Sequence, residues 1–532
     1  MLEQLGGTII ISILIILPIL HAVHELRKNR RLKLPPGPAA LPFIGNVHQI
    51  PSENSHLTFT EWGRRYGIRF LALLYPSPHG HAQGPIVHLS ILGKSMIVLN
   101  TAKAALDVLE KKGAIYADRP RLVMAGEIVG YEKAVTLAPY DNMHRQRRRL
   151  IHEAFSPKKL SRYDEFRERR VRQLLYDLLD DAANFQRHIH RRVPYVAALV
   201  FNASHGHEVR GHDDLLVLLA EQCGADFSEM VRPGAYLVDV LPFLRSLPDW
   251  YPFANFKRKA RLYRTTAERM RDIPFDFVRE QLRNGAAKPS LTTDILEAKP
   301  NRTPEEDLSY RWLTATIYAG VRCIIEMNSY HRKSTSLLNS FILTMALNTE
   351  VQHKAQAELD QVLGPKILPS FADRDSLPYI RALCLEILRL YYPTPTGLPH
   401  LATEDDEYMG YQIPAGAIVI ANTWGILRDP TNYAEPEKLL PERFLTSNFI
   451  DPRTFAFGYG RRVCPGGQFA EEMIFMAVAT ILSVYDITGG PAAPSNVEFT
   501  SNLVMHPKPF KCIIRPRSPE VESFIKDCRG FP

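Results

Sequence analysis

One cysteine, Cys464, lies in a loop whose composition suits a thiolate that binds a metal. Two glycines ahead of it, Gly458 and Gly460, permit positive φ angles, so the backbone can bend tightly around a flat cofactor. Two arginines follow these glycines, and their charge favours the anionic sulfur, which is the form that ligates metal. Pro465 and the apolar run after it predict a helix that begins just beyond the cysteine. The free N–H groups of that helix end would hydrogen-bond the sulfur.

The residue type alone leaves other interpretations of Cys464 open. A lone cysteine is most often a buried structural residue. A zinc site is disfavoured because the other cysteines show no C-x-x-C pairing; they are Cys223, Cys323, Cys384, Cys512 and Cys528. The specified neighbours of Cys464 outweigh the structural interpretation.

The pattern F-x-x-G-x-R-x-C-x-G resembles the haem-binding loop of the cytochrome P450 family. It is filled here by Phe457, Gly460, Arg462, Cys464 and Gly466. The resemblance implies that Cys464 is the axial ligand of the iron in haem b, iron protoporphyrin IX. It also implies that the other four residues form the cofactor-binding loop and that Arg462 contacts a haem propionate.

Two further motifs support the resemblance. Glu386 and Arg389 are three residues apart in a segment with helical apolar spacing, so both charges share one helix face. Charges among so many apolar residues need partners. Pro441-Glu442-Arg443-Phe444 offers one, because in this family the arginine of that motif joins the E-x-x-R pair in a buried ionic triad. We therefore assign Glu386, Arg389 and Arg443 a structural role.

The resemblance also implies which residues contact the haem propionates. His144 and Arg148 share a helical face at i,i+4, where the family usually has tryptophan and arginine. His144 departs from that pattern but can still donate a hydrogen bond. His400 matches a third propionate position. The alternatives are a solvated basic helix face for the first pair and ordinary packing for His400.

The segment that should activate oxygen departs from the family pattern. After Ala319-Gly320 the family has an acid and a threonine that relay protons to iron-bound dioxygen, and this chain lacks the pair. The spacing from Gly320 to Phe341 is roughly nine residues longer than in the family. Glu326 and Thr335 are weak candidates to replace the missing pair, because an insertion of that length shifts the helical register.

We expect two insertions, at residues 68–84 and about 321–333. Both have the character of translated introns or splice errors in the gene model. The missing acid–threonine pair keeps two alternatives to an oxygenase open. One is a haem-thiolate isomerase or dehydratase that needs no reductase, and the other is a catalytically impaired haem-binding membrane protein from a mis-spliced gene.

The N-terminus predicts a membrane anchor. Residues 5–23 are mostly apolar and about long enough to span a bilayer core of roughly 30 Å. Basic residues follow the apolar run, whereas a cleaved signal peptide carries them before it. The positive-inside rule then places the catalytic domain on the cytosolic side of the endoplasmic reticulum membrane, held by a single pass. We divide the chain into an anchor at 1–25, a basic, proline-rich hinge at 26–45 and a haem domain at 46–532.

The haem domain is predicted to be mainly α-helical with a smaller β region, which is the cytochrome P450 fold. Two strands are expected at 86–92 and 95–99 around a turn at Gly93-Lys94. Thr303 and Glu306 form a capping box that opens one helix, and Asn348 caps another that runs to about Val362.

Composition excludes one class of function. The 65 basic and 57 acidic residues give a net charge of +8, but the basic residues are dispersed and no nucleic-acid-binding motif is present. Nucleic acid is therefore not expected as a partner. A basic face for an acidic redox partner is compatible with the charge.

The resemblance to fungal microsomal members of the family, such as O-methylsterigmatocystin oxidoreductase, implies a monooxygenase. It would insert one oxygen atom of O2 into an apolar small molecule, a secondary metabolite or a xenobiotic. The chain has no flavin or nicotinamide motif, so electrons would come from a separate NADPH-cytochrome P450 reductase, with cytochrome b5 as a further candidate donor. Thr396, Gly397, Leu398 and Val504 match positions that often line the substrate pocket, and core packing explains each of them equally well.

Overall fold

The computed structural model describes most of the chain from residue 32 onward. The described residues are 32–51, 53–74, 84–182, 185, 195–209, 213–232, 234–251, 254–320, 336–490, 498–500 and 504–527. The predicted anchor at 1–25, the whole of the insertion at 321–333 and the candidates Glu326 and Thr335 lie outside these ranges. Of the other predicted insertion, residues 68–74 continue a helix and 75–83 lie outside the described residues.

Helices dominate the described residues, as the sequence predicts. Those of eight residues or more are α2 (Ser55–Leu74), α4 (Asn142–Ala154), α6 (Asp164–Asp180), α8 (Tyr195–His205), α9 (Leu215–Val231), α11 (Asn255–Arg283), α12 (Leu291–Ala298), α13 (Pro304–Gly320), α14 (Ser336–Leu347), α15 (Thr349–Val362), α16 (Pro378–Leu390), α19 (Gly467–Val484) and α20 (Pro519–Asp527). Shorter helices are α3 (Ala102–Ala105), α5 (Pro157–Leu160), α10 (Leu237–Val240), α17 (Thr423–Ile426) and α18 (Arg453–Ala456).

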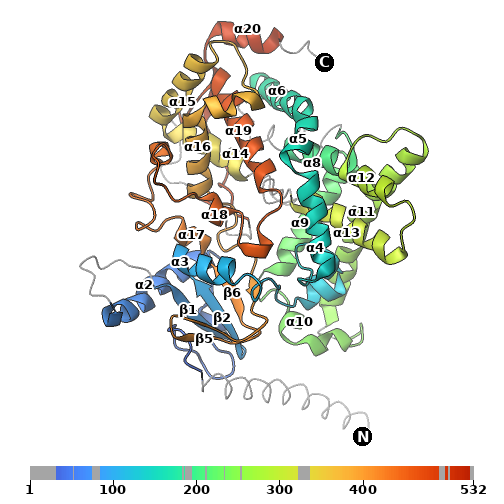
Figure 1. Ribbon diagram of the computed structural model, residues 1–532, viewed down its shortest axis with the longest axis vertical. Coiled ribbons are helices and arrows are strands. Elements are labelled where there is room, and N and C mark those ends of the chain that lie inside the picture. Colours follow the sequence, from blue (N-terminus) through green and yellow to red (C-terminus); the bar gives the residue numbers. More distant parts are fainter. Residues whose placement is uncertain are drawn as a thin grey trace.

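The β region consists of three small sheets in the described part of the chain. The largest has the order β1-β2-β6-β3, and the others are the pairs β4-β5 and β7-β8. The strands are β1 (Ile86–Ile91), β2 (Lys94–Leu99), β3 (His400–Leu401), β4 (Asp406–Tyr408), β5 (Tyr411–Ile413), β6 (Ile418–Ala421), β7 (Tyr485–Thr488) and β8 (Ile513–Pro516). Figure 1 shows β1, β2 and β6 in the lower half of the molecule and α14, α15, α16 and α19 in the upper half.

The predicted strand pair is confirmed, with its turn one residue earlier than expected. β1 and β2 pair antiparallel, and Ile91 lies opposite Lys94. The two turn residues are therefore Leu92 and Gly93, and both have positive φ, at 49° and 86°. Two-residue turns with positive φ at both positions match the right-handed twist of paired strands, which explains this choice of turn. β6 then pairs parallel to β2 and brings residues more than 300 positions away into the same sheet.

Local signals at helix ends were right in one case and wrong in two. The predicted capping box of α13 is present, because Thr303 and Glu306 exchange side-chain to backbone hydrogen bonds of 3.0 and 3.2 Å. α15 has the predicted extent, but Asn348 does not cap it; its amide instead donates to the Thr344 carbonyl at 2.9 Å. α19 begins at Gly467, so Pro465 lies in the turn before the helix and not in its first turn.

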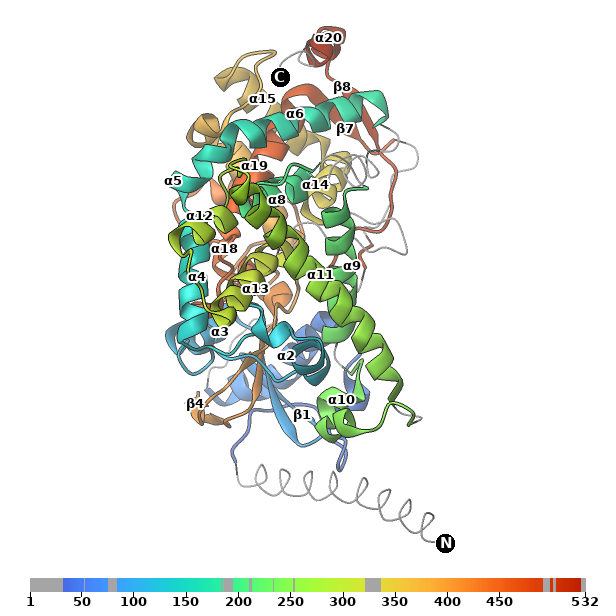
Figure 2. The same ribbon diagram turned by 90° about the vertical axis from the view of Figure 1, so that its right-hand side faces the viewer.

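The hydrophobic core surrounds α16 and α19, which pack against each other and against α14 and α15. By length and composition, α19 is the helix among the described residues that could cross a membrane, but 72% of it is buried in protein, as expected for a core helix. Figure 2 shows the long helix α11 running diagonally across the side of the molecule that faces the viewer, with α10 near its lower end. The loop that carries Cys464 leads directly into α19, so the core fixes its position.

Candidate active site

The loop between α18 and α19 holds Cys464 in a backbone conformation that only glycine tolerates at two positions. Gly458 and Gly460 have φ angles of +84° and +52°. A Cβ atom on Gly460 would lie 2.3 Å from the carbonyl oxygen of Leu109, so the close approach also requires glycine. The Cys464 amide donates to the Phe457 carbonyl at 2.6 Å and closes the loop. The expected positive φ angles are confirmed.

Cys464 combines an exposed residue surface with a thiol that is crowded by neighbouring atoms. The cysteine is solvent-exposed, yet burial among neighbouring atoms raises the pKa of its thiol. A hydrogen bond from the Gly466 amide and the charge of Arg148 oppose this shift. The expectation that all neighbours favour the anion is therefore wrong, because desolvation outweighs the polar groups. A bound metal cation would reverse the balance, since a coordinating thiol is deprotonated outright.

Arg462, two residues before the cysteine, turns its guanidinium into the protein. It donates to the carbonyl oxygens of Ala138 and Val135, at 2.6 and 3.2 Å, and to that of Ala117. It also donates to Nε2 of His144 on α4, at 2.6 Å. Arg462 and His144, both predicted to contact haem propionates, therefore meet, although 318 positions separate them in the sequence.

Further basic side chains gather around this contact. Arg148 lies one helical turn after His144 and makes no hydrogen bond or ion pair with any residue that the structure describes. Arg119 donates to the carbonyl oxygens of Leu398 and Pro399, both at 2.8 Å, while its buried Nε has no partner. His400 contacts the Tyr116 carbonyl through Nδ1 at 2.8 Å. We call Arg119, His144, Arg148, His400 and Arg462 the basic cluster.

The pKa values in the basic cluster show that its positive charge is poorly compensated. Burial, followed by the charges of Arg462 and Arg148, lowers the pKa of Arg119 to about 9. Burial likewise lowers the pKa of Arg462 to about 10. The pKa values of His144 and His400 fall to about 3, first through burial and then through neighbouring arginines. A cluster of this kind is suited to bind a group that carries carboxylates.

The three charged residues predicted to form a triad also meet. Glu386 and Arg389 on α16 are fully buried, and Arg389 donates to the carboxylate from Nε at 2.7 Å and Nη2 at 2.9 Å. Arg443 donates to the same carboxylate at 3.2 Å, as does the Leu440 amide at 2.9 Å. Every charge thus has a partner of opposite sign, which is the condition for burying them.

Comparison with known proteins gives this arrangement a family. Residues 35–514 match the family model of cytochrome P450. The chain belongs to the cytochrome P450 family. It is similar to cytochrome P450 monooxygenase 208 of Postia placenta, with 35% identity over 96% of each chain. It is also similar to cytochrome P450 monooxygenase claR of Ampulloclitocybe clavipes, with 36% identity over 93% of this chain and 89% of that one.

A third relative, cytochrome P450 monooxygenase COX2 of Coprinopsis cinerea, is 34% identical over 94% of this chain and 92% of its own. The similarity to these fungal proteins extends over nearly the full length of each. The protein is a cytochrome P450 monooxygenase, and the family implies a haem-thiolate centre, dioxygen and a redox partner.

The residues of this P450 fit a haem on two independent observations. Cys464 is an exposed residue, and a cysteine sulfur is the soft, single ligand that haem iron takes in thiolate proteins. The unpartnered Nε of Arg119 and the unpaired Arg148 offer donors for carboxylates such as the haem propionates. Glycines at 458 and 460 supply the positive φ angles that the loop conformation requires.

The other predicted positions are distributed around the same region. Thr396, Gly397 and Leu398 lie in the loop between α16 and β3, where the Leu398 carbonyl accepts from Arg119. Val504 is buried near the C-terminus. Their assignment to the substrate pocket stays a prediction.

Sequence reasoning missed two residues of the site. Arg119 follows Tyr116-Ala117-Asp118, and the sequence around it contains no motif that sets it apart from other charged residues. Tyr140 lies four residues before His144, just ahead of α4, and its ring contacts several of the arginines. Both residues reach the site through contacts distant in sequence, which motif spacing does not reveal.

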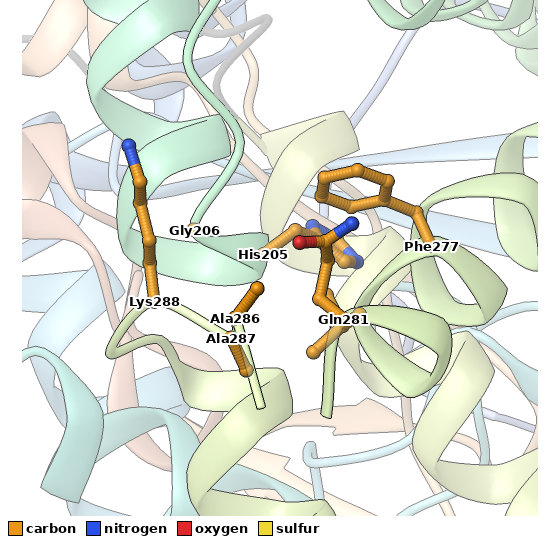
Figure 3. Close-up of a pocket in the computed structure, with 8 residues that line it drawn as sticks. His205, Gly206, Phe277, Gln281, Ala286, Ala287 and Lys288 are labelled. Atoms are coloured by element: carbon orange, nitrogen blue, oxygen red, sulfur yellow. The ribbon is translucent and has the colours of Figure 1, made fainter. Parts of the chain in front are cut away.

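A small pocket elsewhere in this P450 shares no residue with the basic cluster. It lies between the end of α8 and α11, and its lining residues are His205, Gly206, Phe277, Val278, Gln281, Ala286, Ala287 and Lys288. Figure 3 shows Phe277, Gln281 and His205 near one another, whereas Lys288 points away. Its space of about 50 Å³ suits a few water molecules and not an organic substrate.

Proposed function

We propose that this P450 binds haem b through Cys464 and oxidises an apolar small molecule, either a secondary metabolite or a xenobiotic. One observation carries the proposal: Cys464, an exposed cysteine, lies in the same loop as Arg462, whose guanidinium belongs to the basic cluster. A thiolate ligand and a set of carboxylate-binding groups are thus held together by one short segment. When bound, the haem supplies dioxygen activation, and the thiolate donates electron density that favours O–O cleavage.

The protein's own contribution is to hold and orient that group. Cys464 provides the sulfur, and the Gly466 amide donates a hydrogen bond to it, which tempers its electron donation. Phe457 closes the loop through its carbonyl, while Gly460 allows the loop to press against Leu109. The protein's own atoms therefore hold the loop conformation.

Arg462, Arg148, His144, His400 and Arg119 would hold the propionates. Their donors come from four separate stretches of chain: the 116–119 segment, α4, the strand β3 that contains His400, and the Cys464 loop that contains Arg462. Binding of two carboxylates would relieve the mutual repulsion of the buried cations. The triad of Glu386, Arg389 and Arg443 would act at a distance, by fixing α16 against the turn Pro441–Phe444.

Proton delivery is assigned to the stretch that follows Gly320. Glu326 and Thr335 remain our candidates there, in place of the acid–threonine pair of other family members. We also retain the hypothesis that residues 68–84 and about 321–333 are insertions that the mature transcript lacks. Sequencing of that transcript tests it, and a message that contains both segments would contradict it.

Electrons would reach the haem from a separate NADPH-cytochrome P450 reductase, with cytochrome b5 as an additional donor. Exposed cations near the Cys464 loop support an acidic partner; they include Arg145 and Arg461, which both lie over the Tyr140 ring. Complementary charge of this kind accelerates docking of a partner and orients it.

A membrane location follows from the proposed anchor at 1–25 and hinge at 26–45, ahead of a haem domain at 46–532. We assign the protein to the endoplasmic reticulum, with this domain facing the cytosol. Three exposed apolar side chains around α10 and the start of α11 support contact with a bilayer: Leu237 (66% exposed), Trp250 (80%) and Leu262 (65%). Large exposed apolar groups of this kind mark interaction surfaces.

The electron supply can be tested without knowing the substrate. The purified P450 is mixed with NADPH and a fungal P450 reductase under carbon monoxide, and the ferrous–CO spectrum is recorded. In the absence of dithionite, we expect the thiolate-type band only when both NADPH and the reductase are present. Direct reduction with dithionite is the positive control. A band with dithionite but none with NADPH and reductase would contradict the proposed electron source. A saturable spectral shift on titration with 7-ethoxycoumarin, an apolar probe, tests the nature of the pocket, and no shift with any apolar probe would contradict it.

A further inference from the structure

Tyr140 lies where several cationic side chains meet. The guanidinium carbon of Arg461 is 5.3 Å from the centre of its ring, and those of Arg145 and Arg462 are 5.6 and 5.7 Å away. The imidazole of His144 lies 5.3 Å from the same ring, at an angle of 59°. Cations within about 6 Å of an aromatic face are attracted by its negative electrostatic potential. One ring therefore interacts with three arginines at once.

The backbone holds this ring in place. The Tyr140 amide donates to the Asp118 carboxylate at 2.6 Å, and the next residue, Asp141, caps α4 by accepting from the His144 amide at 2.6 Å. Asp118 belongs to the 116–119 segment, whose Ala117 carbonyl accepts from Arg462. The ring is thus tied to the two pieces of chain that position Arg462.

The ring also separates cations in different surroundings. Arg462 is buried, whereas Arg145 and Arg461 are exposed. Arg462 is repelled by Arg148 and attracted by Asp118 and Asp141, although no carboxylate forms an ion pair with Arg461 or Arg462 among the described residues. An aromatic face between such charges offsets part of their repulsion without neutralising them.

We propose that Tyr140 is a positioning residue for the haem propionates, and that its ring keeps Arg462 directed into the basic cluster while Arg461 and Arg145 stay outside. The inference rests on the proposed binding of haem at Cys464. It goes beyond that binding because it assigns a residue that need not touch the cofactor. The interaction is with the π face, so the hydroxyl group is not required.

The test compares two variants of the holoprotein. Tyr140→Phe keeps the π face, and Tyr140→Leu removes it while keeping an apolar side chain. The readout is the rate of haem transfer to excess apomyoglobin, which does not depend on catalytic activity. We expect Tyr140→Leu to accelerate transfer about fivefold, within the range that cation–π interactions allow, and Tyr140→Phe to change it less than about twofold. Tyr66→Leu is a matched control, because Tyr66 also lies beside an arginine, Arg65 at 5.8 Å, but on α2.

The outcomes separate this role from simple packing and from the proposed function. Equal rates for the Phe and Leu variants, or a rate for Tyr140→Leu no higher than for Tyr66→Leu, would overturn the role of the ring. If Tyr140→Leu does not fold, pentafluorophenylalanine at position 140 keeps the shape but reverses the electrostatic potential of the face, and it must then accelerate transfer as well. Absence of the thiolate-type CO band from the wild-type protein would instead overturn the proposed binding of haem at Cys464.

Discussion

Replacing Glu386 with glutamine tests the energetic importance of the buried triad. The carboxylate accepts four hydrogen bonds, two from Arg389, one from Arg443 and one from the Leu440 amide. Glutamine has nearly the same shape but no charge, so Glu386→Gln leaves two arginines without a counter-charge. Removing one partner of a buried ion pair costs about 3–5 kcal/mol. That loss is a large part of the roughly 5–15 kcal/mol by which proteins are stable.

The magnitude can be converted into a shift of the melting temperature. The unfolding entropy scales with chain length, so for a chain of this size a loss of about 3–5 kcal/mol lowers Tm by about 3–5 °C. Thermal unfolding of the purified holoprotein, followed by circular dichroism at one fixed scan rate, measures it. A fixed rate is needed because large proteins often unfold irreversibly.

Glu442→Gln is the matched control for Glu386→Gln. Glu442 adjoins Arg443 in the same turn, but its ion pair with Lys354 is exposed, at 2.6 Å. Exposed pairs contribute at most about 1 kcal/mol, so this control is expected to lower Tm by about 1 °C or less. A Tm for Glu386→Gln equal to that of the control would refute the argument that the triad stabilises the fold.

Three further predictions follow from the site and its surroundings. Gly460→Ala places a Cβ atom at a φ of +52° and 2.3 Å from the Leu109 carbonyl oxygen, so the haem content of the purified protein should fall. The control Gly416→Ala also has a positive φ but open space around the Cβ atom, so it should keep its haem. Equal haem content in the two variants would contradict the close-approach argument. Arg119→Gln should weaken haem retention about tenfold, because it removes a charge-assisted hydrogen bond to a carboxylate. The rate of haem transfer to apomyoglobin measures this effect. An unchanged rate would contradict a role for Arg119 in binding the haem propionates. Burial lowers the pKa of His205 to about 3, so this histidine is neutral in the folded protein but protonates near pH 6.5 in the unfolded chain. It therefore destabilises the fold as pH falls below 6.5, by about 1.4 kcal/mol per pH unit. His205→Gln should show a smaller drop of Tm between pH 7 and pH 5 than the wild type, and an identical drop would contradict the pKa shift.

Features set by neighbours in the sequence were predictable. The β1–β2 hairpin and the Thr303–Glu306 capping box depend on a few adjacent residues, and both are present. Gly458 and Gly460 likewise indicated the positive φ angles of the Cys464 loop. The meeting of Glu386, Arg389 and Arg443 was predicted from a family resemblance, because no local rule links residues that far apart.

Features set by tertiary packing were not predictable. The start of α19 was placed too early, since the turn at Pro465 and Gly466 is needed to direct the Gly466 amide at the sulfur. The pKa of Cys464 was expected to fall because its charged neighbours were visible in the sequence, whereas its desolvation was not. Arg119 and Tyr140 were missed because their contacts depend on how distant segments pack.

The ferrous–CO difference spectrum of the dithionite-reduced protein tests the central claim most directly, because it reports the ligand opposite the carbon monoxide. The account predicts the thiolate-type band for the wild type and its loss in Cys464→Ala, with the far-ultraviolet circular dichroism of both proteins alike. A wild-type protein that contains haem but lacks this band, or a Cys464→Ala variant that keeps it, would contradict the assignment of Cys464 as the ligand.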